Sequence, residues 1–146
     1  MELNKLTIKE AGELLRDKKI TSVELTTACL NRIKSLDDKI QACLCVCETE
    51  ALAQAAAADK RIAAGETGAL LGIPYLVKDN ILVAGLQATA GSKILKNYIA
   101  PYNATAVARL NAAGAVILGK TNMDEFGHGG STENSAYQTT SRSDFG

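Results

Sequence analysis

The stretch GIPYLVKDN, residues 72–80, places an amine where it can do chemistry. The apolar run 73–77 predicts a buried strand, and it ends in Lys78 followed by Asp79. Desolvation disfavours the ammonium form of a lysine, so an amine in apolar surroundings can act as a base near neutral pH. The alternative is a surface lysine at a strand end, which extends into solvent or pairs with Asp79. The residue types alone favour this second interpretation, because lysine is seldom fully buried.

Cysteines offer a second kind of chemistry. Three alternate in the run CLCVC, residues 43–47, and Cys29 lies upstream. Metal sites usually space cysteine ligands two to four residues apart with a second pair or histidines nearby, but the single histidine, His128, is distant in sequence. Period-two alternation predicts that the three thiols share one face of a strand, where reduced cysteine packs as a small hydrophobic residue. A structural role is therefore favoured over metal or redox chemistry.

The C-terminal part carries acidic and glycine-rich groups. Asp124 and Glu125 are adjacent, so on a helix they face different ways, and a pair of charges at a helix N-terminus is favoured over paired-carboxylate catalysis. The segment Gly129–Thr132 either allows close backbone approach to a ligand or forms an ordinary turn, and both interpretations stay open. His128, among loop glycines, is expected to be a polar surface residue.

Composition bounds the class of protein. The 146 residues fit one domain, and 47% are hydrophobic against 22% charged, the balance of an ordinary soluble globular chain. The formal net charge is zero, which gives no indication of a nucleic-acid or membrane surface. The apolar runs are too short to span a membrane and the N-terminus lacks a signal-peptide pattern, so a cytoplasmic location is expected.

The first part of the chain, about residues 1–66, predicts helices. Thr7 with Glu10 and Thr21 with Glu24 have the spacing of capping boxes, and each is followed by apolar residues three or four apart. A short strand is expected at about 42–47. An alanine-rich helix at about 48–64 follows, with Gly65 at its C-terminal end.

The remainder, about residues 67–146, predicts part of a sheet. A strand is expected at 73–77, a helix at 104–113 with Asn103 as its N-cap and Gly114 beyond its end, and a strand at 115–118. The continuous apolar run of the last strand is typical of a strand covered on both faces. Strand, crossover helix and strand in this order predict a βαβ unit with a parallel pair, and hence an α/β fold.

Three segments together resemble the amidase signature family: LGIPYLVKDNI, the run from ATAGSKIL through GKTNMDEF to GGSTENSAYQ, and the upstream ITSVELTTACLNRIKSLDDKIQACLCV. The resemblance extends from about Leu6 to Thr140. It implies that residues 1–146 are the N-terminal part of one amidase signature domain. In that fold, N-terminal helices precede a mixed β-sheet, of which this chain would hold a truncated portion.

The resemblance also implies a chemistry. Family members hydrolyse amide bonds with a Ser–cisSer–Lys triad, and Lys78 occupies the position of the lysine. Met123, Gly130 and Ser131 would line the substrate pocket. Both family serines lie in a G-G-S-S-G-G-S motif that the 146 residues do not contain. The chain is therefore expected to be inactive alone, and none of its serines (Ser131, Ser135, Ser141, Ser143) is assigned as the nucleophile.

Within the family, MDEF followed by STENSA favours the glutaminase subunit of tRNA amidotransferases over a general amidase. This resemblance implies glutamine as substrate, two partner subunits (B and C) and an indirect relation to misacylated Glu-tRNA(Gln) or Asp-tRNA(Asn). No cofactor would be bound by this chain, whereas ATP and Mg²⁺ would be used by a partner subunit. A cytoplasmic location, or an organellar one in a eukaryote, would follow. A general small-molecule amidase and a non-catalytic remnant or interaction domain are the alternatives.

Overall fold

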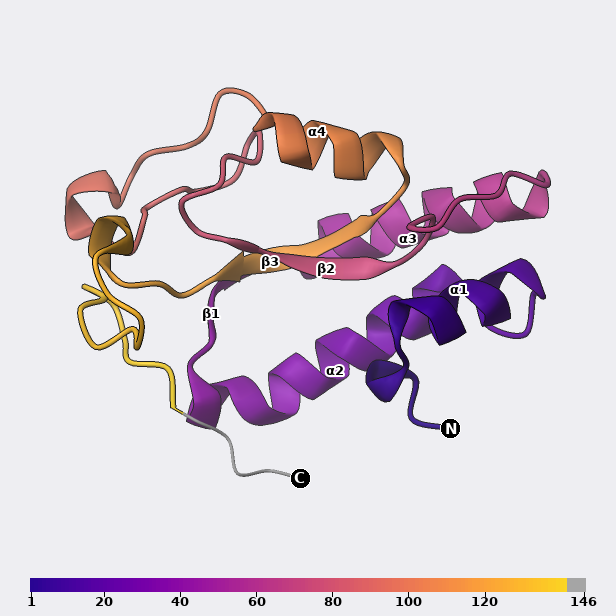
Figure 1. Ribbon diagram of the computed structural model, residues 1–146, viewed down its shortest axis with the longest axis horizontal. Helices are drawn as coiled ribbons and strands as arrows, with labels where there is room; N and C mark the ends of the chain where they lie inside the picture. Colours follow the sequence, from indigo (N-terminus) through magenta and orange to yellow (C-terminus); the bar gives the residue numbers. More distant parts are fainter. Residues whose placement is uncertain (142–146) are drawn as a thin grey trace. The chain divides into compact units, whose positions relative to one another are not determined.

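The computed structural model describes residues 1–141 and has a mixed α/β fold (Figure 1). The expectation for Ser143 lies outside the described residues. In chain order the elements are η1 (Leu3–Lys5), α1 (Ile8–Arg16), α2 (Ser22–Ile40), β1 (Cys43–Val46), α3 (Glu48–Ala63), β2 (Pro74–Lys78), η2 (Lys93–Leu95), α4 (Thr105–Ala112), β3 (Val116–Thr121) and η3 (Glu125–Gly127), where η marks a short 3-10 helix. Within this described part, none of the helices has the length and apolar character needed to cross a membrane.

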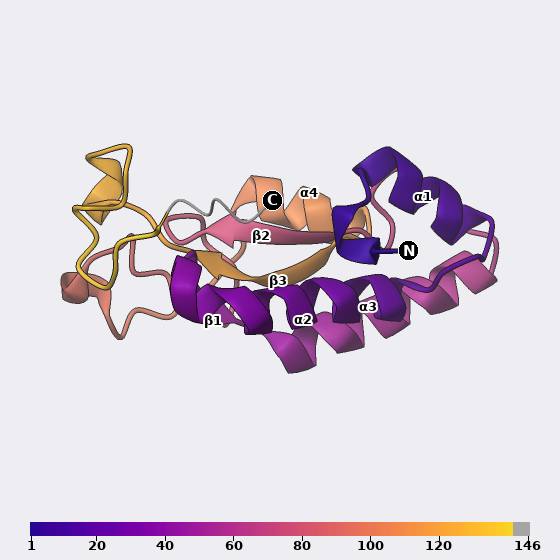
Figure 2. The ribbon, with the colours of Figure 1, turned by 90° about the horizontal axis from the view of Figure 1, so that it is seen from below.

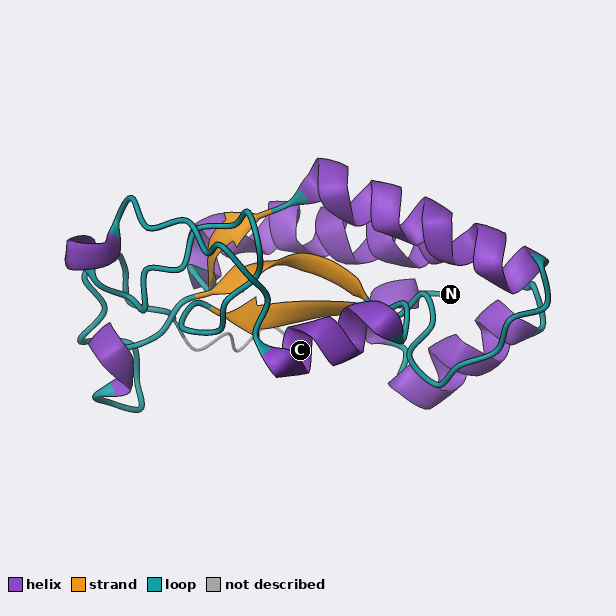
Figure 3. Ribbon diagram, turned by 90° about the horizontal axis from the view of Figure 1, so that it is seen from above, coloured by secondary structure: helices purple, strands orange, loops and turns teal. Residues whose placement is uncertain are grey.

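The three strands form one sheet in the order β1-β3-β2. β2 and β3 run parallel, because the Val116 N–H donates to the Ile73 carbonyl at 2.9 Å and the Asp79 N–H donates to the Thr121 carbonyl at 3.2 Å. These two strands lie side by side in Figures 1 and 3, and β1 pairs antiparallel with β3. The predicted βαβ unit is therefore confirmed. β3 extends to Thr121, beyond the predicted end at residue 118, because the ladder continues through Gly119 and Lys120.

The cysteine-rich strand departs from the prediction. The pairing of β1 with β3 shifts register between Cys43 and Cys45, and Cys47 follows the strand as the N-cap residue of α3. Cys47 is buried, whereas Cys43 and Cys45 are half-buried. The three cysteines therefore do not alternate along one regular strand, because the register shifts between the first two and the third lies beyond the end of β1.

The chain forms two compact units. Unit 1 comprises residues 1–35, 47–75 and 109–118, and unit 2 comprises residues 36–46, 76–108 and, within the described part of the chain, 119–141. β2 and β3 each begin in unit 1 and end in unit 2.

Helix ends in unit 1 follow the sequence signals. Thr7 and Glu10 form a reciprocal capping box at α1, and the Thr21 N–H donates to Glu24 Oε2 at 2.7 Å at α2. At the end of α3, Gly65 has φ of +88°, and its N–H donates to the Ile62 carbonyl at 3.0 Å. A left-handed residue of this kind stops a helix and satisfies its last carbonyls.

The core of unit 1 lies where the helices meet Ile73, which directly precedes β2, and the first residues of β3. α2 and α3 run antiparallel, since the Ser22 N–H donates to Asp59 at 2.6 Å and Lys34 pairs with Glu48 at 3.7 Å (Figure 2). Two apolar clusters result. The first contains Ala11, Leu15, Ile20, Leu25 and Ile73, and the second contains Leu30, Ala51, Ala55, Val116 and Leu118.

The start of β3 obtains hydrogen bonds from α3 instead of a strand. The Ile117 N–H donates to the side-chain oxygen of Gln54 at 3.0 Å, and the Cys47 N–H donates to the Leu118 carbonyl at 2.8 Å. Gln54 thus satisfies a backbone donor that would otherwise need a neighbouring strand.

In unit 2 the long connection from β2 to α4 is packed. Val83, Ala88 and Ala100 are buried. Asn103 was predicted to cap α4, but its side chain accepts the Ala84 N–H at 2.8 Å, and the helix begins at Thr105. Asn103 therefore closes the connecting loop, because its carboxamide oxygen is committed to Ala84.

Candidate active site

Lys78 is the last residue of β2 and its side chain is exposed. Its neighbours Val77 and Asp79 are 5% and 2% exposed, as the alternation of side chains along a strand requires. The Lys78 carbonyl accepts the Ile81 N–H at 2.9 Å, which forms a turn directly after the strand. The prediction that this amine is desolvated is wrong for the described part of the chain, because the Lys78 side chain is exposed. Its role as the triad lysine stays a prediction.

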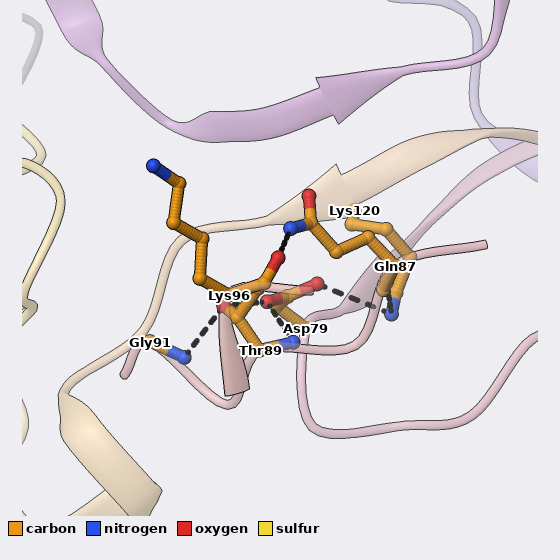
Figure 4. A network of polar contacts seen from close by, with 6 residues as sticks. All are labelled: Asp79, Gln87, Thr89, Gly91, Lys96 and Lys120. Atoms are coloured by element: carbon orange, nitrogen blue, oxygen red, sulfur yellow. Dashed lines mark hydrogen bonds and ion pairs between the residues drawn. The ribbon is translucent and has the colours of Figure 1, made fainter. Parts of the chain in front are cut away.

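Asp79 is held through each of its backbone and side-chain polar groups. Its N–H donates to the Thr121 carbonyl, and its own carbonyl accepts the Ala90 N–H at 3.4 Å. Its carboxylate oxygen Oδ2 accepts the Thr89 N–H at 2.8 Å and the Thr89 hydroxyl. Figure 4 shows this network at the end of β2. A carboxylate that is 2% exposed needs such partners, since a buried charge without them is costly.

Lys120, in β3, is the partner of that carboxylate. Its side chain is fully buried, and Nζ lies 3.2 Å from Asp79 Oδ1 and donates to the Gln87 carbonyl at 3.1 Å. Sequence reasoning missed this residue, although a signal was present. A lysine that continues a strand buried on both faces requires a buried acceptor. Asp79 directly follows the neighbouring parallel strand and is the carboxylate within reach.

Asp124 organises the loop that follows β3. Its carboxylate accepts the N–H groups of Ser131, Thr132 and Asn134 at 3.1, 2.9 and 2.9 Å. These donors, Thr132 first, lower the pKa of Asp124 from its ordinary value. Asp124 and Glu125 lie at the N-terminal end of η3, as expected, the first as its N-cap residue and the second in its first turn. The Asp124 side chain makes no cap bond to η3, and its oxygens instead accept the loop N–H groups. A Cβ on Gly129 would lie 2.5 Å from the Asp124 carboxyl carbon, so glycine is required there.

The residues predicted to line a pocket lie around this loop. Met123 is 1% exposed, whereas Gly130 and Ser131 are exposed. Ser131 donates its N–H to Asp124 and its hydroxyl to Glu133 at 3.1 Å. Met123 is thus adjacent to Asp124 in the chain, and Ser131 is hydrogen-bonded to the Asp124 carboxylate. Their contact with a substrate stays a prediction, and His128 is exposed as expected.

The segment STENSAYQ folds against the end of β3 through Asn122. The Ser135 hydroxyl donates to Asn122 Oδ1 at 2.7 Å, and Asn122 Nδ2 donates to the Gln138 carbonyl at 2.8 Å and to Thr140 Oγ1 at 3.0 Å. Asn122 is 8% exposed, so these bonds satisfy a buried amide. The Ser135 hydroxyl is thus engaged in holding the loop.

Unit 2 thus contains the exposed amine of Lys78, the buried ion pair of Asp79 and Lys120 next to it in the chain, and the glycine-rich loop ordered by Asp124. Among residues 1–141, no group of three or more His, Cys, Asp and Glu side chains is placed to hold a metal ion. The arrangement can position an amine for proton transfer.

Comparisons with known proteins identify relatives of this chain. The amidase family model matches residues 24–143. The A subunit of the glutamyl-tRNA(Gln) amidotransferase of Dehalococcoides mccartyi (strain CBDB1) is 52% identical over 139 residues, which are 95% of this chain and 29% of that protein. Among solved structures, the native peptide amidase from Stenotrophomonas maltophilia is 36% identical with a TM-score of 0.79, over 84% of this chain and 26% of that one. The A subunit of the Thermotoga maritima glutamyl-tRNA(Gln) amidotransferase is 34% identical with a TM-score of 0.73, over 96% and 28%.

The mixed α/β scaffold of this chain is thus shared with the peptide amidase and with the amidotransferase A subunit. The chain belongs to the amidase family. It spans less than a third of the length of the curated relatives it matches.

Proposed function

We propose that this chain is the N-terminal portion of the glutaminase subunit of a tRNA-dependent amidotransferase. That subunit would release ammonia from glutamine for the conversion of Glu-tRNA(Gln) to Gln-tRNA(Gln). The observation that carries the proposal is 52% identity over 139 residues to the A subunit of a glutamyl-tRNA(Gln) amidotransferase.

In this proposal Lys78 supplies the base of the triad. A lysine amine accepts the proton of a bridging serine, which in turn activates the nucleophilic serine, as in other Ser–Lys variants of triad chemistry. The serine motif of the family is absent from the 146 residues, so these residues alone do not hydrolyse glutamine. Because Lys78 is exposed in unit 2, the amine must become covered when the serines join it.

The partner roles follow from the same relationship. Subunits B and C would complete the complex, and a partner subunit would use ATP and Mg²⁺ and hold most of the tRNA. The zero formal charge of this chain fits a subunit that leaves the polyanion to its partner.

A hybrid subunit tests the proposal. This chain replaces the matching segment of the Thermotoga maritima A subunit, and the hybrid is purified with subunits B and C. We expect glutamine-dependent ammonia release, which Lys78→Ala abolishes and Lys93→Ala, at an exposed lysine of the same unit, leaves intact. The 146-residue chain alone should release no ammonia. Activity of the hybrid that persists in Lys78→Ala, or turnover by the chain alone that vanishes in Lys78→Ala, would overturn the proposal.

A second candidate is an amidase that acts on small amides or peptides without partner subunits. The similarity to the Stenotrophomonas maltophilia peptide amidase favours it. Co-expression of the tagged chain with subunits B and C separates the two candidates. Retention of both subunits supports the amidotransferase, whereas no retention, together with hybrid hydrolysis of peptide amides in preference to glutamine, supports the amidase.

A further inference from the structure

We infer that Asp79 and Lys120 are positioning residues for Lys78, an inference that rests on the function proposed above. The pair fixes the backbone from which the Lys78 amine extends. It also ties the end of β2 to the loop that carries Met123.

The chain directly after Lys78 is restrained by hydrogen bonds and an ion pair. Asp79 is bound through its N–H, its carbonyl and both carboxylate oxygens, to Thr121, Ala90, Thr89 and Lys120. Lys78 itself accepts the Ile81 N–H. The backbone on the C-terminal side of the Lys78 Cα therefore has little freedom, while the side chain on the opposite face is exposed.

Lys120 fixes the orientation of the Asp79 carboxylate. Its ammonium group engages Oδ1 of Asp79, which leaves Oδ2 to accept both donors of Thr89. Without Lys120 the carboxylate is buried with one oxygen lacking its cationic partner, and it can rotate away from Thr89 or draw in water. The orientation of Asp79 thus depends on a residue of the neighbouring strand.

Contacts through Thr89 and Gly91 connect the ion pair to the loop that carries Met123. Thr89 Oγ1 accepts the Gly91 N–H at 3.2 Å, and Gly91 has φ of +69° with its Cα packed under the Met123 carbonyl. A Cβ at this position would lie 2.5 Å from that carbonyl oxygen. Figure 4 shows the contacts Asp79–Thr89–Gly91. Through the close approach of Gly91 to Met123, these contacts link the residue after Lys78 to the loop ordered by Asp124.

A pair kept only for stability would behave differently from a positioning pair. A buried ion pair replaced by apolar residues of similar volume is often no less stable than the original. In the double variant Asp79→Leu/Lys120→Met, the buried charges are removed together, but the acceptor for Thr89 is lost. Stability and positioning are therefore separable in one molecule.

The first experiment uses the 146-residue chain. Amide hydrogen exchange is compared in the native chain, Asp79→Asn, Lys120→Met and the double variant, with Asp38→Asn and Lys93→Met as matched changes at exposed residues. We expect the amides of Asp79, Thr89, Ala90 and Gly91 to exchange at least about 10-fold faster in all three pair variants. The amide of Val116, in unit 1, should keep its rate in the double variant. Unchanged exchange at residues 79 and 89–91 would overturn the inference.

The second experiment uses the hybrid enzyme. We expect Asp79→Asn, Lys120→Met and the double variant to lower kcat at least about 10-fold with KM for glutamine within about 2-fold, because a misplaced base slows proton transfer without removing a substrate contact. Lys120→Arg should recover part of kcat. Restoration of kcat by the double variant would show a structural role only and overturn the inference.

The failures of the two proposals are distinguishable. If Lys78→Ala abolishes activity but the pair variants do not lower kcat, the positioning inference fails and the proposed function stands. If Lys78→Ala is active, the proposed function fails, and with it the role that the pair would serve.

Discussion

Lys120 Nζ and Asp79 Oδ1 lie 3.2 Å apart, and the two side chains are 0% and 2% exposed. The pair joins two parallel neighbouring strands at the point where the chain leaves β2 for its long connection to α4. Lys78, the residue with the chemistry expected from its family, is adjacent in sequence and points to the opposite face. The buried ion pair and the exposed Lys78 amine thus lie on opposite faces of the sheet at the end of β2.

Removal of one partner of this pair should strongly destabilise the chain. Asp79→Asn or Lys120→Met leaves a buried charge uncompensated, and we expect a loss of about 3–5 kcal/mol in the free energy of unfolding, measured by urea denaturation. The double variant Asp79→Leu/Lys120→Met should lose much less than the sum of the single variants. Additive losses would show that the two side chains do not interact.

Gly91→Ala should destabilise the chain more than Gly85→Ala. Both glycines have positive φ, +69° and +80°, so alanine is strained at either position by about 1–2 kcal/mol. A Cβ at Gly85 has no heavy atom within 4 Å, whereas at Gly91 it meets the Met123 carbonyl oxygen at 2.5 Å. Thermal unfolding of the two variants isolates the contact, and equal melting temperatures would contradict it.

The loop ordered by Asp124 should loosen only in acid. Its backbone donors lower the pKa of Asp124 below the ordinary 3.8. The carboxylate therefore contributes its full stability above that value and loses it as pH falls through the lowered pKa. The amide shifts of Ser131, Thr132 and Asn134, followed by NMR, should titrate together with a midpoint below 3.8. Asp124→Asn should abolish this transition, and a midpoint above 3.8 would be inconsistent with these bonds.

Cys43 should resist alkylation. Burial first, and then the charge of Asp37, raise the pKa of its thiol from 9.0 to about 11. At about pH 8.5 the reactive thiolate is then on the order of 100-fold scarcer than for an ordinary thiol. Asp37→Asn should lower the pKa and speed modification by iodoacetamide, read by mass spectrometry, whereas Asp38→Asn at an exposed site should not. Equal rates in the two variants would exclude the influence of Asp37.

The helices and the βαβ unit were predictable because their signals are local. The capping boxes at Thr7 and Thr21 and the glycines after α3 and α4 depend on residues a few positions apart. The break in the cysteine pattern was not predictable, since the register of β1 is set by its pairing with β3. Asn103 was predicted to cap α4, and its actual bond to Ala84 was missed because that partner is 19 residues away in the chain.

The candidate site was predictable in part. The position of Lys78 at the end of a strand follows from the sequence, but its exposure depends on which residues pack over it. Lys120 required the inference that a lysine in a doubly covered strand must meet a carboxylate from a neighbouring strand. The position of Asp124 at the start of η3 was predictable, but its side-chain partners, 131–134, were not, because no local signal defines the path of the loop that contains them.

The bond between Gln54 and Ile117 has a consequence for growth of the sheet. The Ile117 N–H is bonded to the Gln54 carboxamide, and the Leu118 carbonyl accepts the Cys47 N–H. These backbone groups of β3 are therefore already hydrogen-bonded and cannot pair with an incoming strand. β2 lies at the other border of the sheet and carries Pro74, a residue that sheets accommodate at their borders. A fourth strand, whether from a longer polypeptide or from another molecule, would therefore add at a border strand, β2 beside Lys78 or β1, and not at this stretch of β3.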